Sequence, residues 1–219
     1  MCIRDRGWFV ATQVAGELSA SPEATVGVLY RTNAQSRILE EAMRRQRIEY
    51  RMVGGFSFYA RAEVKDVLAY ARFASNLQDS ASFARVLNSP PRGIGETTLS
   101  AIEESARRHK LSSWEALEHE VAANTLPARA VRALEKFRSL IQELVQDRER
   151  MSMGEFFKSI LVRTGYVRVL EAEETPEAEG RIENLRELVN AAEAAEASGE
   201  TLAEFLDRAA LVSDADSYD

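Results

Sequence analysis

The spacing of apolar residues changes at Gly54-Gly55, and this change constrains the fold more than any other feature of the chain. Beyond it, apolar residues recur at helical spacing in one segment after another, as far as Leu211. These segments cover residues 61–76, 80–88, 97–109, 112–117, 127–149, 153–164, 178–198 and 201–211. Their succession predicts an all-helical domain with one continuous hydrophobic interior.

The residues before Gly54-Gly55 predict strands as well as helices. Helical spacing over residues 8–18 is followed by an apolar run at 25–31 that is typical of a buried strand, by a helix to about Arg47 and by a second strand at 48–53. A short crossover of this kind implies parallel pairing. Because two strands do not make a stable sheet alone, we expect the edge of a larger α/β domain whose other strands lie outside this chain.

The expected fold class is therefore mainly α with a small α/β part, in which a partial parallel β-α-β unit precedes an all-helical domain. Residues 1–6 fit neither pattern and are expected to be a leader foreign to the protein. Residues 7–55 would form the partial α/β domain and residues 56–211 the helical domain. Residues 212–219, which are acidic and polar, would form a loose tail.

Composition narrows the class of protein. A content of 45% hydrophobic and 29% charged residues over 219 positions is typical of a soluble globular protein. No run approaches the roughly 20 apolar residues that span a bilayer, so no membrane partner is expected. The only cysteine is Cys2, which excludes an internal disulfide and favours a cytoplasmic protein. With that cysteine and two histidines, no metal site is expected.

The net charge of −7 argues against a nucleic-acid partner, but its distribution does not. Residues 31–72 carry nine Lys or Arg and five Asp or Glu, whereas residues 111–219 carry twelve and twenty-three. A basic segment joined to an acidic one is what a polyanion bound on one side would require. The alternative stays open that the acidic helices only keep the protein soluble.

A polar corner lies between the first predicted strand and the helix that follows it. Its sequence is Tyr30-Arg31-Thr32-Asn33-Ala34-Gln35-Ser36-Arg37, in which Thr32 and Gln35 have the spacing of a capping box. Unpaired backbone N–H groups at a helix start, next to cationic side chains, suit a phosphate-bearing partner. Arg31 and Asn33 are the candidate contacts, although Arg31 could form an internal salt bridge and Asn33 could be a plain N-cap. Arg37, inside the helix, is interpreted as structural.

A glycine-rich turn before the helix at 97–109 is the second candidate site. Gly93-Ile94-Gly95 would let the backbone approach a phosphate with no Cβ in the way, while Ile94 anchors the turn in the core. Arg92 adds charge, and Thr97 and Thr98 could cap the helix or donate to the same phosphate. Such a site reads no bases and would hold duplex backbone irrespective of sequence. A tight turn without a ligand is the alternative.

Three segments, taken in order, resemble the UvrD/PcrA/Rep family of superfamily 1 DNA helicases. They are YRTNAQSR at 30–37, YRMVGGFSFYARAEVKD at 50–66 and RVLNSPPRGIGETT at 85–98. The resemblance covers nearly everything after residue 6. It implies a fragment made of the first part of motor domain 2A, residues 7–55, and the inserted helical domain 2B, residues 56–211.

The resemblance also implies roles for the candidate residues. Arg31 and Asn33 would contact the single strand, and Arg92, Gly93, Ile94, Gly95, Thr97 and Thr98 the duplex backbone. Phe56, Phe58 and Tyr59 could stack on bases, but packing at the domain junction is favoured, in part because Ser57 stands where the family often has lysine. Glu63, Lys65 and Asp66 are interpreted as helix-surface and domain-contact charges.

The motor motifs of the family are missing from this sequence. There is no Gly-x-x-x-x-Gly-Lys-Ser/Thr loop for ATP phosphates and no Asp-Glu motif for magnesium. No catalytic residue and no cofactor are therefore expected here, and the fragment alone is predicted to be inactive. ATP and Mg²⁺ are expected for the full-length protein, an ATP-dependent 3′-to-5′ DNA helicase acting in repair or replication.

The partners implied are DNA and the remaining motor domains of the helicase, with repair proteins as further candidates. Two alternatives remain open at this point. One is a stand-alone, non-catalytic helical module that binds DNA or a protein. The other is part of a helicase–nuclease of the RecB or AddA kind.

Overall fold

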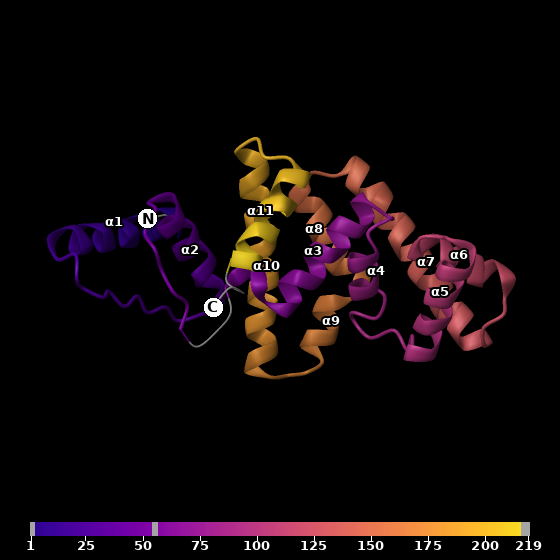
Figure 1. The fold of residues 1–219 in the computed structure, drawn as a ribbon. Coiled ribbons are helices and arrows are strands. Elements are labelled where there is room, and N and C mark those ends of the chain that lie inside the picture. Colours follow the sequence, from indigo (N-terminus) through magenta and orange to yellow (C-terminus); the bar gives the residue numbers. More distant parts are fainter. Residues whose placement is uncertain (1–2, 54–56, 216–219) are drawn as a thin grey trace.

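The computed structural model describes residues 3–53 and 57–215, and every regular element within these ranges is helical (Figure 1). The helices are α1 (Ile3–Ala20), η1 (Asn33–Gln35), α2 (Ser36–Arg45), η2 (Phe58–Ala60), α3 (Ala62–Ser75), α4 (Ser80–Val86), α5 (Glu96–His109), α6 (Ser113–Ala123), α7 (Ala128–Arg150), α8 (Met153–Thr164), α9 (Tyr166–Glu171), α10 (Pro176–Ala197) and α11 (Leu202–Ala215). The prediction of a mainly α fold is confirmed.

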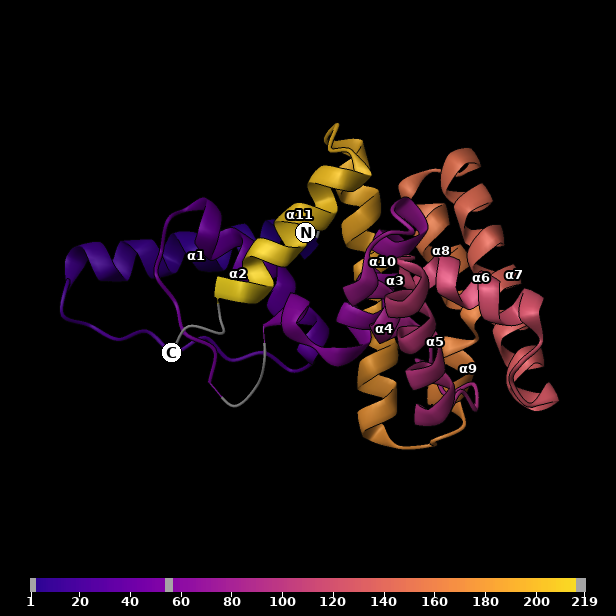
Figure 2. The same ribbon diagram turned by 45° about the vertical axis from the view of Figure 1, so that its right-hand side comes forward.

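The helices are arranged along one long direction. α1 and α2 lie at one end, α3, α8, α10 and α11 form the middle, and α5, α6 and α7 lie at the other end (Figures 1 and 2). α7 has 23 residues, which corresponds to about 34 Å at the rise of an α-helix. The two candidate sites therefore belong to different ends of the molecule: the polar corner precedes α2, and the glycine turn precedes α5.

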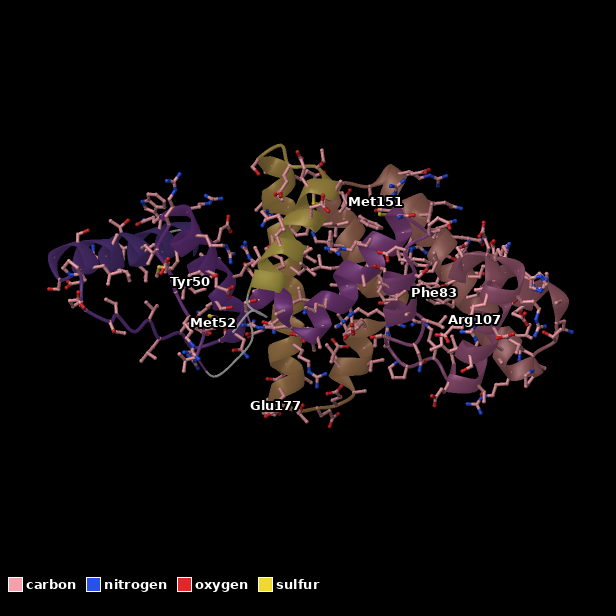
Figure 3. All side chains as sticks on the ribbon, viewed as in Figure 1. Tyr50, Met52, Phe83, Arg107, Met151 and Glu177 are labelled. Carbon is pink, nitrogen blue, oxygen red and sulfur yellow. The ribbon has the colours of Figure 1, made fainter. Side chains whose placement is uncertain are left out.

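One hydrophobic cluster runs through the helical part, from Phe58 to Ala209. Aromatic rings join its helices edge to face: Phe73 of α3 lies 5.6 Å from Phe83 of α4 and 5.8 Å from Trp114 of α6, and Phe83 lies 6.1 Å from Phe137 of α7, measured between ring centroids. Figure 3 shows Phe83 within this part of the molecule, and its side chain is 2% exposed. The single continuous interior expected from the periodicity is present.

Several helix starts follow directly from short polar patterns. Ser112 and Glu115 form a capping box at α6, and Ser152 and Glu155 form another at α8. Accepting the Ser112 N–H holds the pKa of the Glu115 carboxyl below its usual range. Because each pair satisfies N–H groups that a helix start leaves unpaired, the boundaries of these helices are fixed locally.

The predicted β-α-β unit is not formed: within the described residues, segments 25–31 and 48–53 contain no strand. Leu29 is 98% exposed and Val53 is 89% exposed, so neither apolar run is buried. The physical reason is that a strand requires a neighbouring strand to which it can hydrogen-bond. Within the described residues, neither segment has such a neighbour. Instead, the extended segments connect helices, and Figure 3 shows Tyr50 and Met52 on the second of them, near α2.

The N-terminal helices have a small core of their own, made by Ala11, Val14, Ala42 and Met43. α1 and α2 cross closely, since a Cβ on Gly7 would come within 2.5 Å of Ile38 Cγ2. The helix also begins at Ile3 instead of near Trp8, so it includes part of the expected leader. The foreign origin of residues 1–6 and the domain limits at 55 and 211 stay predictions.

Two further boundaries differ from expectation. α9 occupies Tyr166–Glu171, a segment for which no helix was predicted. α11 continues to Ala215, so residues 212–215 are helical and not a loose tail, while residues 216–219 lie outside the described range. Gly54, Gly55 and Phe56 lie outside it as well.

Phe157→Ala in α8 is expected to lower the free energy of unfolding by about 3–5 kcal/mol, because the side chain is fully buried and packs on Phe205. Val162→Ala on the same helix is the matched control, since Val162 is 70% exposed and its truncation should cost less than about 0.5 kcal/mol. Chemical denaturation of both variants measures the difference. Equal losses would show that the interior is not packed as described.

Candidate nucleic-acid interface

The polar corner is shaped by Gln35. The side-chain Oε1 of Gln35 accepts the backbone N–H groups of Arg31 at 3.0 Å and Thr32 at 3.4 Å. The backbone N–H of Gln35 donates to the Thr32 carbonyl at 3.0 Å. The predicted pairing of Thr32 with Gln35 is therefore present. It also uses two of the N–H groups that were expected to be free. The N–H groups of Asn33 and Ala34 have no partner among the described residues, so the corner retains an anion-binding face.

Arg31 and Asn33 both have exposed side chains, and neither side chain makes a hydrogen bond or ion pair with a described residue. The residue that caps η1 is Thr32, so Asn33 is not the N-cap. No described carboxylate pairs with Arg31. Both side chains are thus available to a ligand, whereas Arg37, as interpreted, is structural: it is 7% exposed and pairs with Glu187 of α10 at 2.6 Å.

Arg61 connects the corner to the helical part. Its Nη1 donates to the Asn33 carbonyl at 2.7 Å and to Asn184 Oδ1 of α10 at 2.8 Å, and its Nη2 donates to Ser36 Oγ at 2.9 Å. Asn184 in turn donates to Glu63 Oε1 at 2.7 Å. Burial lowers the pKa of Arg61, and the neighbouring carboxylates oppose that shift. One buried guanidinium therefore fixes the backbone of the corner.

The glycine turn places Ile94 inward and its two glycines outward. Ile94 is 4% exposed, whereas Gly93 and Gly95 are exposed. Gly93 has φ +72°, in the left-handed region that favours glycine. Gly95 is different: its φ of −81° suits any residue, and a Cβ there would meet nothing closer than Thr97 Oγ1 at 3.9 Å. Nothing within the described chain requires a glycine at position 95.

Gly95 also caps α5, whose first backbone N–H groups face outward. The N–H groups of Thr98 and Leu99 donate to the Gly95 carbonyl, but those of Glu96 and Thr97 have no partner in the described part of the chain. The Thr97 side chain is exposed, whereas Thr98 is 8% exposed. Glu96 places an exposed carboxylate in the same turn. Thr97 is thus accessible to a ligand, and Thr98 is mainly enclosed.

Arg92 is committed to the loop that carries the glycines. Its Nη1 donates to the carbonyls of Val86 at 2.9 Å and Pro90 at 3.1 Å, and its Nη2 bonds the Tyr70 hydroxyl. The guanidinium also lies 5.7 Å from the Tyr70 ring centroid and 5.5 Å from that of Phe137. Burial raises the pKa of Tyr70 to about 12, so its hydroxyl stays protonated. Contact of Arg92 with DNA stays a prediction that would compete with these bonds.

Asp66 holds the other side of the same loop. Its carboxylate accepts Ser89 Oγ at 2.6 Å, Arg85 Nε at 2.7 Å and the Tyr166 hydroxyl at 2.7 Å. Asp66 and Glu63 are 8% and 4% exposed, so the interpretation of both as helix-surface charges is wrong. Glu63 accepts from Asn184 within the helical part, and contact with another domain stays a prediction. Helical spacing could not reveal their partners, because those partners come from distant segments.

Two of the aromatic residues that follow Gly54-Gly55 in the sequence, Phe58 and Tyr59, are packed inside. Phe58 and Tyr59 are 0% and 1% exposed, and their rings meet edge to face at 5.1 Å, which agrees with the packing interpretation. Phe56 lies outside the described residues. Ser57 is 1% exposed, so residues 57–59 present no side chain to a strand of DNA.

One cation that the sequence reasoning missed lies beside the glycine turn. Arg129 Nη2, at the start of α7, is 3.6 Å from the position of a Cβ on Gly93. The signal was present, since Arg129, Arg132 and Lys136 recur at the spacing of one helix face. The spacing alone could not connect these cations with the glycine turn, because the sequence does not show that the start of α7 lies next to that turn.

The described residues contain neither a membrane span nor a cluster of metal ligands. No helix among them is long and apolar enough to cross a bilayer. No group of three or more histidine, cysteine, aspartate or glutamate side chains within residues 3–53 and 57–215 is arranged to hold a metal ion.

Arg92→Lys should destabilise the glycine loop by about 1–3 kcal/mol, because an ammonium cannot replace the planar fork that reaches three acceptors at once. Hydrogen exchange is expected to accelerate at the Ser89 and Arg92 amides, while the amides of α8 keep their protection. If protection in the loop is unchanged and only DNA binding weakens, Arg92 is a DNA contact and not a clamp.

Comparison with known proteins shows the family to which this chain belongs. The family model described as "UvrD-like helicase C-terminal domain" matches residues 9–218 of this chain. The chain is 40% identical over 196 residues to the ATP-dependent DNA helicase PcrA of Bacillus subtilis, which is 89% of this chain and 26% of that protein. It is 39% identical over 168 residues to DNA helicase II of Escherichia coli, 77% of this chain and 23% of that protein.

A third relative, the ATP-dependent DNA helicase PcrA of Staphylococcus epidermidis, is 34% identical over 224 residues, 100% of this chain and 31% of that protein. The chain thus spans only about a quarter to a third of the length of these relatives. The family match nevertheless covers nearly the whole chain, in agreement with the resemblance of its three motifs. The chain belongs to the UvrD-like helicases, within their C-terminal domain.

Proposed function

We propose that this chain is the DNA-binding part of an ATP-dependent DNA helicase that unwinds duplex DNA in repair or replication. Its residues 7–55 belong to motor domain 2A and its residues 56–211 to the helical domain 2B. The extended segments at 25–31 and 48–53 pair with strands of the remaining motor domains, which would bury Leu29 and Val53. The motor domains supply the ATP and Mg²⁺ sites, and this part alone does not hydrolyse ATP.

The observation that carries the proposal is the glycine turn. Gly95 is exposed, sits at the start of α5 and is not required by its own φ or by any neighbouring atom. A glycine that the fold does not need is explained by a backbone that must approach a ligand closely. The outward N–H groups of Glu96 and Thr97 then bind a duplex phosphate, with the Thr97 hydroxyl as a further donor.

The polar corner is proposed as a second phosphate contact, made by Arg31, Asn33 and the free N–H of Ala34. Its assigned ligand is the single strand. A protein named as an ATP-dependent DNA helicase handles two kinds of phosphate, however, those of DNA and those of ATP. The geometry of the corner suits either one, and the second experiment below distinguishes them.

The first experiment substitutes Gly95 by alanine. The variant should keep its melting temperature, because the Cβ has room, yet its affinity for a blunt DNA duplex should fall about tenfold, since the methyl group lies between the amides and the phosphate. Gly180→Ala, at a site where a Cβ meets nothing within 4 Å, is the control and should bind as the original does. Fluorescence anisotropy measures the affinity; unchanged binding by Gly95→Ala would contradict the duplex site.

The second experiment substitutes Arg31 by alanine, with Arg47→Ala as control because Arg47 is equally exposed and lies outside the corner. Affinity for a single-stranded oligonucleotide should fall about tenfold in the first variant only, the loss of one charge-assisted contact. The same variants are tested for ATP in the full-length helicase. If Arg31→Ala weakens ATP binding and leaves the oligonucleotide affinity unchanged, the corner binds nucleotide and its assignment to the single strand is wrong.

A further inference from the structure

The proposed duplex site lacks a source of positive charge within its own loop. Arg92 donates to backbone carbonyls and to Tyr70, so its charge is turned into the loop. Glu96 adds a carboxylate to the first turn of α5. Because binding of duplex backbone depends on neutralising phosphates, the cations must come from another element.

α7 is the element that lies against the turn. Arg129 Nη2 approaches the Gly93 Cβ position to 3.6 Å, which places the start of α7 beside the outward face of the loop. Arg129, Arg132 and Lys136 follow one another at spacings of three and four residues, so they share one face of the helix. We refer to these three residues as the α7 row.

The members of the α7 row are exposed, and none makes a hydrogen bond or ion pair with a described residue. Residues 111–219 hold twelve basic and twenty-three acidic residues. Some of the other arginines there have carboxylate partners, whereas Arg150 and Arg168 form no ion pair with a described residue. Examples of the pairs are Arg163 with Asp147 at 2.5 Å, Arg181 with Glu173 at 2.9 Å and Arg208 with Glu200 at 2.8 Å.

We propose that the α7 row continues the duplex site, so that Arg129, Arg132 and Lys136 bind successive phosphates of one strand whose first phosphate lies at the glycine turn. The row extends about 10 Å along the helix, from seven residues at 1.5 Å each. Phosphates of one DNA strand follow at about 3.4 Å along the duplex axis, so the row spans roughly three of them. This inference rests on the proposed duplex contact of Gly95.

The proposal predicts a specific change in salt dependence. Each phosphate contact contributes about 0.9 to the slope of log affinity against log salt concentration. Arg129→Gln, Arg132→Gln and Lys136→Gln should each lower that slope by about 0.9, and the triple variant by roughly 2.7. Since the side chains are exposed and unpaired, the melting temperature should stay unchanged.

The matched control is Arg150→Gln, an exposed arginine in the last turn of the same helix. It lies 21 residues from Arg129, about 31 Å along α7, and should leave the slope unchanged. The probe is a blunt 20-base-pair duplex bound to the 219-residue chain, measured by anisotropy over a range of potassium chloride concentrations. Each single variant carries the same net charge change, so any difference between Arg150→Gln and a single row variant reports position.

The outcomes separate this inference from the function on which it rests. A lowered slope in the row variants, with Arg150→Gln unchanged, supports it. If Gly95→Ala weakens binding but the triple variant keeps the original slope, the proposed role of the α7 row is wrong, and the duplex contact at Gly95 stands. If Arg150→Gln lowers the slope as much as the single row variants do, the effect is one of net charge, and the proposed role of the α7 row is overturned. Absence of salt-dependent duplex binding would overturn both proposals.

Discussion

Arg61 and Arg37 hold together two parts of the molecule that have separate hydrophobic cores. The small core of α1 and α2 contains four buried residues and could not fix its own position against the helical part. The buried guanidinium of Arg61 spans the gap between the Asn33 carbonyl and Asn184, and Arg37 reaches Glu187 on the same helix. The Arg37–Glu187 ion pair, like other buried ion pairs, adds little net stability against an apolar alternative, but its geometry is demanding, as is that of the hydrogen bonds of Arg61. These contacts therefore define where the corner lies more than how stable the chain is.

The same division between anchoring and presenting holds at the glycine turn. Three groups that the motifs contain are used inside: Arg92 binds carbonyls, Asp66 binds Ser89, and Ile94 enters the core. What remains outside is backbone, at Gly93, Gly95 and the start of α5. A rigid loop costs less entropy when a ligand binds, because its conformation is already fixed. The charged residues of the motif thus support a neutral, amide-rich surface.

Sequence patterns predicted the features that are local. The capping pair Thr32 and Gln35, the helices after residue 57 and the inward Ile94 all depend on residues a few positions apart. The failures involve distant partners. Residues 25–31 have the composition of a strand, but a strand exists only when a neighbour supplies its hydrogen bonds. Glu63 and Asp66 were assigned to a surface because their acceptance of Asn184 and Tyr166 depends on contacts more than 90 residues away. The position of Arg129 beside Gly93 could not be predicted for the same reason, because the two residues lie far apart in the sequence.

An acidic chain can bind a polyanion only if its charges act over short distances. The Debye length is about 8 Å at physiological ionic strength, whereas α7 alone is about 34 Å long. Carboxylates near the far end of α7, or near Glu177, which Figure 3 shows at the lower end of α10, are therefore largely screened from the glycine turn. The net charge of −7 then governs solubility and repulsion between copies of the chain, while the few unpaired cations around Gly93 decide what the turn can bind.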